Sequence, residues 1–189
     1  MREPAKRTLS FACKAMAGTP AGAKIPLANI RFAGAASDSR TVKKGQLFFA
    51  LPGERVDGFD FCKDAAHAGA AAVVVADGRG RPAGCEDVPV IAVADPRKAL
   101  GDLAAAVRRL FKGKVIGVTG SNGKTTTKEL IAAALSPAGK VLATQGNLNT
   151  DVGMPLTILS ATGREDYWVL EMAMRGAGEI GRASCRERV

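Results

Sequence analysis

The chain has 189 residues, enough for one or two domains, and its apolar content of 47% and charged content of 24% are ordinary for a globular protein. No apolar run approaches the roughly 20 residues of a membrane-spanning helix, and the basic N-terminus lacks the apolar core of a signal peptide. The formal net charge is +9, but the basic residues are scattered and no aromatic residues interleave with them. We therefore expect a cytoplasmic protein that acts on small anionic substrates and binds no nucleic acid.

The cysteines and the single histidine form no metal-binding pattern. Cys13, Cys62, Cys85 and Cys185 lie far apart in the sequence, and none belongs to a C-x-x-C pair. We expect them to be small apolar residues, buried or half-buried, rather than members of disulfides or of a metal cluster. His67 lies in an alanine-rich segment, where a solvated or capping position near a helix end is expected rather than catalysis.

The first part of the chain predicts a small α/β domain that ends at residue 112. Aliphatic and aromatic runs bounded by Gly and Pro predict strands, and amphipathic or alanine-rich segments predict helices. Asp95 and Pro96 fit the cap and the first position of the last helix, and Lys-Gly-Lys follows that helix. The strands are expected at 47–51, 71–76 and 89–94, and the helices at 7–18, 61–70 and 96–111.

A polar triplet, Asp38-Ser39-Arg40, comes before the first of these strands. An acid, a hydroxyl and a guanidinium side by side can bind a polar ligand. They can equally close a turn, because an Asp side chain accepts a hydrogen bond from the backbone two residues further on. Spacing alone favours the turn.

The second part, from residue 113, predicts a doubly wound parallel sheet. The apolar run 115–118 reads as a buried parallel strand, and two more strands are expected at 141–144 and 167–170. Between them lie a polar, Asn-rich loop at 145–151 and an apolar run at 152–160 that contains Pro155.

The first strand of this part leads into a glycine-rich turn and a helix. The sequence from Gly120 to Thr125 is G-x-x-G-K-T, and helical character continues over 128–135. Glycines let backbone N–H groups turn inward, the helix N-terminus adds partial positive charge, and a lysine adds a full charge, so this construction can hold a polyphosphate. The longer motif G-x-x-x-x-G-K-[ST] is not met, because Val118 stands at its first position. An ordinary strand–helix turn is the alternative.

Glu171 follows the third strand of this part directly. A carboxylate at the carboxyl end of a central strand lies on the ligand edge of such a sheet, and burial without a partner would be costly. A Mg²⁺ ion held by nucleotide phosphates is the expected partner, with Thr125 as a second ligand. A salt bridge to Lys or Arg is the alternative.

Taken together, these segments resemble the Mur ligases, the ATP-dependent amide-bond-forming enzymes of peptidoglycan synthesis. Phe59 and the pair Asn149-Thr150 depart mildly from the family, which often has His and a second Asn there. Within the family, the Ser of the loop and the Lys-Glu that follows it favour the branch that adds D-Ala-D-Ala to UDP-MurNAc-tripeptide. The resemblance rests on SDSRTVKKGQLFFALPGERVDGFDF, GVTGSNGKTTTKE, GNLNTDVGMPLTIL and LEMAMRGAGEI.

The resemblance implies ATP and Mg²⁺ as cofactors, an acyl-phosphate intermediate, and a monomer at full length. Lys124 and Glu171 would be catalytic, and Thr125 and Glu171 would bind the metal. A diamino-acid ligase acting on UDP-MurNAc-dipeptide, and a nucleotide-binding module without ligase chemistry, are the alternatives. ATP would contact Gly120, Ser121, Asn122, Gly123, Lys124, Thr125, Thr126, Asn147 and Asn149, and the uridine diphosphate would contact Ser39, Arg40, Gly53, Glu54 and Arg55.

The C-terminal end departs most from the family pattern. We expect 1–112 to bind the UDP-muramoyl peptide and 113–180 to be an incomplete ATP-binding domain. Residues 181–189 resemble a translated sequencing adapter rather than native sequence. We accordingly expect the 189-residue chain to have no ligase activity by itself.

Overall fold

A computed structural model describes residues 7–21, 26–53 and 56–173. Glu54, Arg55 and the adapter-like tail lie outside this part of the chain. The chain forms two units, Ala5–Leu103 and a second that begins at Ala104, so the division falls inside a helix. The functions assigned to the two ranges stay predictions. In the described ranges, no helix has the length and apolar character needed to cross a membrane.

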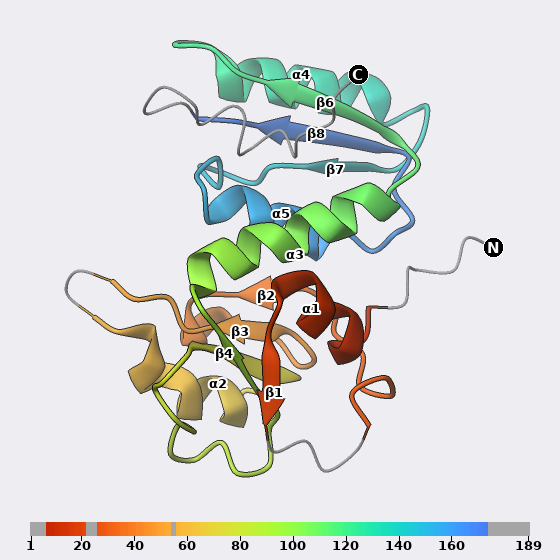
Figure 1. The fold of residues 1–189 in the computed structure, drawn as a ribbon. Coiled ribbons are helices and arrows are strands. Elements are labelled where there is room, and N and C mark those ends of the chain that lie inside the picture. Colours follow the sequence, from red (N-terminus) through yellow and green to blue (C-terminus); the bar gives the residue numbers. More distant parts are fainter. Residues whose placement is uncertain (1–6, 22–25, 54–55, 174–189) are drawn as a thin grey trace. The chain divides into compact units, whose positions relative to one another are not determined.

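A five-stranded sheet organises the first unit, with strand order β1-β5-β4-β3-β2 (Figure 1). Only β1 runs antiparallel to its neighbour; the other pairs are parallel. The strands span β1 Thr19–Ala21, β2 Ala35–Ala36, β3 Leu47–Phe49, β4 Ala72–Ala76 and β5 Val90–Val93. The helices are α1 Leu9–Met16, η1 Ser39–Thr41, η2 Gly58–Phe61, α2 Cys62–His67 and α3 Pro96–Leu110.

Both faces of the inner strands β3, β4 and β5 are largely buried, which explains the near-continuous apolar runs in these strands. Phe48, Val73 and Val90 share a row of the register and pack with Cys62 and Ala65 of α2. The alternate row, Phe49, Val74 and Ile91, is also fully buried, with 0% exposure at each residue.

The start of α3 follows the sequence prediction. Asp95 Oδ1 accepts hydrogen bonds from the N–H groups of Arg97 at 2.8 Å and Lys98 at 3.2 Å, and Pro96 opens the helix. The Asp side chain satisfies two donors of the first turn, and proline needs no partner there because it lacks an N–H group.

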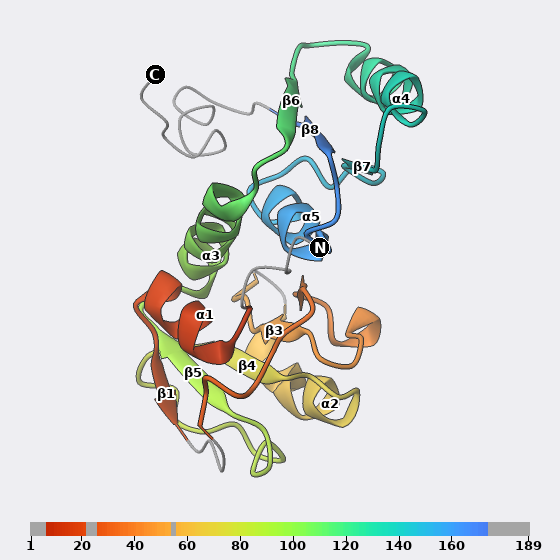
Figure 2. The ribbon, with the colours of Figure 1, turned by 90° about the vertical axis from the view of Figure 1, so that its right-hand side faces the viewer.

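A three-stranded parallel sheet of order β6-β8-β7 organises the second unit. Figure 2 shows α4 on one face and α5 on the other, so the doubly wound α/β expectation is confirmed. The last of these strands along the chain, β8, lies in the middle of the sheet and pairs with both β6 and β7. The elements are β6 Lys114–Val118, α4 Lys124–Leu135, β7 Val141–Ala143, α5 Gly153–Ser160 and β8 Tyr167–Glu171.

The core of the second unit gathers around Trp168. This side chain is 1% exposed, and its ring stacks on Phe111 with centroids 4.1 Å apart and planes 8° apart. The helix α5 accounts for the apolar run 152–160, which sequence reasoning left without a type. Pro155 is tolerated because it lies in the first turn, where its missing N–H has no intrahelical partner.

The first strand of the second unit differs from the expected buried strand. In β6 only Val118 is buried, whereas Val115 and Ile116 are half-buried and Gly117 is exposed. The reason is its place in the sheet: among the described strands β6 is paired on one side only, with β8.

The three described cysteines are buried free thiols: Cys13, Cys62 and Cys85. Burial raises the pKa of all three thiols, and that of Cys62 rises to about 12. In a Cys185→Ser variant we expect no rapid reaction with a disulfide reagent at pH 8 in the native state. The three remaining thiols are buried from the reagent, and their raised pKa values disfavour the reactive thiolate. In denaturant three thiols should react at once. Rapid modification of one equivalent in the native protein would contradict this burial.

Candidate functional site

The turn between β6 and α4 has backbone conformations that require glycine. Gly120 has φ +144° and Gly123 has φ +72°, both in the region that L side chains rarely adopt. Gly123 is also the N-cap of α4, and no side chain caps this helix. The N–H groups in the first turn of α4 are therefore available to a ligand at the N-terminus of the helix, where the helix dipole adds partial positive charge.

Lys124 folds back over the turn that precedes it. Its Nζ donates to the backbone oxygen of Gly120 at 2.7 Å and to that of Ser121 at 3.4 Å. These partners are neutral carbonyls, and a phosphate oxygen is a stronger acceptor for a lysine amino group. The geometry leaves Lys124 within the loop that a polyphosphate would occupy.

Glu171 is a buried carboxylate, 2% exposed, at the carboxyl end of the central strand β8. Its Oε2 accepts from Thr125 Oγ1 at 3.0 Å, and its Oε1 accepts from Asn149 Nδ2 at 2.7 Å. Both donors are neutral, and no ion pair among the described residues includes Glu171. The salt-bridge alternative therefore has no support in this part of the chain.

Oxygen atoms dominate this cluster: a carboxylate, a hydroxyl and an amide. Hard cations such as Mg²⁺ prefer these ligands, and a cation would compensate the buried charge. The cluster therefore fits a magnesium ion next to the turn of residues 120–123, which we call the phosphate loop. Thr125 can donate to Glu171 and ligate a magnesium ion at the same time, because its hydroxyl donates its proton to the carboxylate and keeps an oxygen lone pair for the ion.

The loop after β7 brings only one of its two predicted asparagines to the site. Asn149 donates to Glu171, and its backbone oxygen accepts from Ala173 N at 2.9 Å. Asn147 is exposed in the same loop, and Thr126 is exposed in the first turn of α4. Ser121 and Asn122 are exposed in the phosphate loop itself.

Two buried polar residues beside this cluster were not among the predicted site residues. Lys128 is 0% exposed and Thr144 is 1% exposed. Thr144 Oγ1 accepts from the N–H of Glu171 at 3.0 Å, and Lys128 Nζ donates to the backbone oxygen of Thr144 at 2.6 Å. One signal was available for Lys128: it lies four residues after Lys124, on the same face of α4.

In the first unit, the Asp38-Ser39-Arg40 triplet forms the turn that spacing favoured. Asp38 caps η1 and accepts from Arg40 N at 3.0 Å. Arg40 also binds this carboxylate with its guanidinium, Nε to Oδ1 at 2.9 Å and Nη2 to Oδ2 at 2.6 Å. The guanidinium is largely exposed, Ser39 is half-buried and Gly53 is exposed.

We expect this turn to lose stabilisation in acid. The hydrogen bonds from the Arg40 side chain lower the pKa of Asp38 to about 2 from a usual 3.8. Because the folded-state pKa is the lower one, the contribution is present above about pH 4 and is lost as the pH falls towards 2. Asp38→Asn should therefore lower the urea midpoint at pH 6, and the difference from the unmutated chain should shrink below about pH 4 and disappear near pH 2. A constant difference between the two proteins across this range would contradict the assignment.

Phe59, which departs from the family pattern, also has an observed contact. Its ring carries the guanidinium of Arg79, with Cζ 4.4 Å from the ring centroid. Arg79 Nη1 in turn pairs with Asp57 Oδ2 at 2.6 Å. The departure is thus accommodated by a cation–π contact, and the residue that pairs with Arg79, Asp57, also forms a β-bridge with Pro52.

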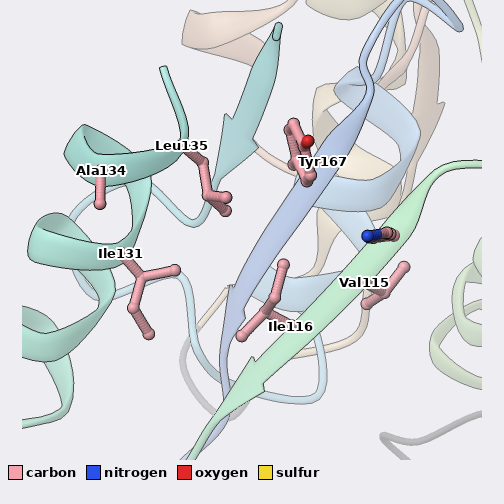
Figure 3. A pocket seen from close by; sticks show the side chains of 7 residues that line it. Val115, Ile116, Ile131, Ala134, Leu135 and Tyr167 are labelled. Atoms are coloured by element: carbon pink, nitrogen blue, oxygen red, sulfur yellow. The ribbon is translucent and has the colours of Figure 1, made fainter. Parts of the chain in front are cut away.

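An apolar groove lies between α4 and the face of β6 and β8 (Figure 3). It is far from the phosphate loop: Lys114 and Tyr167 begin their strands, and Leu135 ends α4, whereas Glu171 and Thr125 lie at the opposite ends of these elements. The groove lining is Lys114, Val115, Ile116, Ile131, Ala134, Leu135 and Tyr167.

The fold and the site together define an α/β protein with a phosphate loop at a strand–helix junction and a buried acidic residue on the next strand of the sheet. Two sequence patterns of one family match the chain. "Mur ligase family, catalytic domain" matches residues 31–108, and "Mur ligase middle domain" matches residues 118–186. The chain belongs to the Mur ligase family.

Curated relatives are similar over most of this chain. A UDP-N-acetylmuramoyl-tripeptide--D-alanyl-D-alanine ligase of Escherichia coli (strain K12) is 44% identical over 153 residues, 81% of this chain and 33% of its own length. One of the same name from Bacillus subtilis (strain 168) is 42% identical over 175 residues, 93% of this chain and 37% of its own length. The chain spans about a third of the length of these relatives.

Solved structures agree with this assignment. A crystal structure of MurF from Acinetobacter baumannii has a TM-score of 0.79 and 36% identity, covering 94% of this chain and 38% of its own. A MurF ligase from Thermotoga maritima in complex with ADP has a TM-score of 0.65 and 36% identity, covering 79% of this chain and 34% of its own.

Proposed function

We propose that this chain is part of an ATP-dependent ligase that adds D-Ala-D-Ala to UDP-MurNAc-tripeptide in the cytoplasm, as a monomer at full length. The observation that carries the proposal is the junction of Thr125, Asn149 and Glu171 in front of the phosphate loop. The names of relatives at 42–44% identity supply the substrates.

The proposed reaction has two steps. The terminal carboxylate of the peptide attacks the γ-phosphorus of ATP, which forms an acyl phosphate and releases ADP. The amine of D-Ala-D-Ala then attacks the acyl carbon, an amide bond forms, and inorganic phosphate leaves. Both steps depend on positioning and on charge stabilisation more than on covalent chemistry from the protein.

The phosphate loop serves the first step. The backbone N–H groups of the turn 120–123 and of the first turn of α4 bind phosphate oxygens. Lys124 Nζ exchanges the Gly120 and Ser121 oxygens, which it contacts at 2.7 and 3.4 Å, for β- and γ-phosphate oxygens. It thereby stabilises the negative charge that develops during transfer.

Thr125 and Glu171 would hold Mg²⁺ beside these phosphates. When bound, the ion neutralises phosphate charge and fixes the orientation of the transferred group. Asn149 holds one oxygen of the Glu171 carboxylate, so the carboxylate is oriented before nucleotide arrives. Asn147 remains a candidate contact to ATP or to the muramoyl peptide.

For the uridine diphosphate we propose Ser39, Arg40, Gly53, Glu54 and Arg55 as contacts. Arg40 is exposed, and its guanidinium binds the carboxylate of Asp38. A diphosphate has to compete with that carboxylate for the guanidinium. Arg40→Ala should weaken UDP binding if the assignment holds.

Calorimetry on the 189-residue chain tests the proposal through binding, since we expect no ligase product from this chain alone. ADP should bind more tightly with MgCl₂ than with EDTA, and UDP-MurNAc-tripeptide should bind more tightly than UDP-MurNAc-dipeptide. A preference for the dipeptide would favour the diamino-acid ligase. ADP binding without any affinity for either UDP-sugar would favour a nucleotide-binding module.

A further inference from the structure

Lys128 is a buried lysine that the proposed chemistry does not use. It is 0% exposed and lies on the side of α4 that faces the sheet. Burial costs a lysine both its hydration and its rotamer freedom, so an apolar residue would pack there at lower cost. Its Nζ contacts two partners: the backbone oxygen of Thr144 at 2.6 Å and the exposed carboxylate of Glu129 at 2.8 Å.

The contact between Lys128 and Thr144 belongs to a connected set of hydrogen bonds around Glu171. From α4, Thr125 donates to the Glu171 carboxylate, and one turn later Lys128 donates to the Thr144 backbone oxygen. Thr144 Oγ1 accepts a hydrogen bond from the N–H of Glu171 at 3.0 Å, and the N–H of Thr144 donates to the backbone oxygen of Val169 at 3.0 Å. The helix thus holds the carboxyl ends of both β7 and β8.

We propose that Lys128 is a positioning residue for the metal-binding carboxylate of Glu171, acting through Thr144. The inference rests on the proposed function of Glu171 as a magnesium ligand. Lys128 fixes Thr144, Thr144 fixes the backbone of Glu171, and the carboxylate is thereby held in reach of Thr125. The same contact fixes the start of the loop that carries Asn149, the other partner of Glu171.

A purely structural role predicts a different outcome. If Lys128 only ties α4 to the sheet, its loss lowers the stability of the whole unit and weakens every ligand in proportion. If Lys128 orients Glu171, its loss lowers the affinity for the metal and leaves metal-free nucleotide binding unchanged. The reason is that the phosphate loop takes no part in the hydrogen bonds that join Lys128, Thr144 and Glu171. The metal therefore separates the two roles.

The experiment titrates Mn²⁺, as a paramagnetic probe for Mg²⁺, into the 189-residue chain with saturating ADP and measures bound Mn²⁺ by EPR. ADP affinity in EDTA is measured in parallel. The variants are Lys128→Met, which keeps length and apolar volume, and Thr144→Val, which removes only the hydroxyl. Glu129→Gln is the matched control, because it removes the exposed ion pair and leaves the Thr144 contact.

We expect Lys128→Met and Thr144→Val each to weaken Mn²⁺ by roughly 10- to 100-fold, as for other groups that orient a metal ligand. ADP affinity in EDTA should change by less than about twofold, and Glu129→Gln should match the unmutated chain. Unchanged Mn²⁺ affinity in folded Lys128→Met, or an equal loss of metal-free ADP affinity, would overturn the proposal. If Lys128→Met does not fold, unchanged Mn²⁺ affinity in Thr144→Val overturns it. An unmutated chain whose ADP binding ignores Mn²⁺ would instead overturn the proposed function.

Discussion

Lys124→Met is expected to weaken ADP binding by at least about 30-fold, which corresponds to losing roughly 2 kcal/mol or more of a charge-assisted contact. The lysine is the only side chain whose amino group already lies on the phosphate loop, within 2.7 Å of Gly120 O, among the described residues. Methionine retains the length of the side chain and removes the charge. Calorimetry with ADP and MgCl₂ measures the change.

Lys140→Met is the matched control for this variant. Lys140 is exposed and lies just before β7, at the end of the sheet away from the phosphate loop. The Lys140→Met substitution removes one positive charge from the unit that contains Lys124. It therefore corrects for the general effect of a basic surface on the affinity for an anionic ligand. Equal losses in the two variants would mean that Lys124 does not contact the phosphates.

Glu171→Gln should have two opposite effects: loss of the magnesium dependence of ADP binding and a gain in stability of about 1–3 kcal/mol. Glutamine retains the shape and can still pair with Thr125 and Asn149. It removes a negative charge that is buried, 2% exposed, beside neutral donors. A site that binds a cation is destabilised while the cation is absent, so the change separates binding from folding.

Urea unfolding followed by the fluorescence of Trp168, the single tryptophan, gives the stability, and calorimetry with MgCl₂ or EDTA gives the metal dependence. Glu165→Gln is the control, because it removes a carboxylate from the connection that precedes β8. It should leave the metal dependence unchanged. A Glu171→Gln protein that is less stable and still responds to magnesium would refute the magnesium assignment.

Local pattern was sufficient to predict the elements that frame the site. Alternation of apolar runs with glycine turns located β6, α4 and β8, and the position of Glu171 at the end of a strand indicated the ligand edge of the sheet. These features depend on a few neighbouring residues, so the sequence contains them directly.

Strand order and cross-strand contacts were beyond local pattern. Glu171 was expected at the end of a central strand, but the position of β6 at one side of that strand was not predicted, so the half-exposed β6 was expected to be buried. Lys128 illustrates the same limit, because a lysine in a helix is usually solvated. Its burial follows from the tertiary packing, which brings the carboxyl end of β7 next to Lys128 and lets its amino group donate to the backbone oxygen of Thr144.

The strand order of the second unit also has a consequence for synthesis on the ribosome. In the first unit β2, β3, β4 and β5 pair with sequence neighbours, so each strand can add to its predecessor as it emerges. In the second unit β6 and β7 have no direct pairing and must wait for β8, which inserts between them. Such non-local pairing is slow. The sequence of the phosphate loop is therefore complete in the nascent chain well before β8 can bring Glu171 beside Thr125, and during this interval β6 and β7 are open to misassembly and to chaperones.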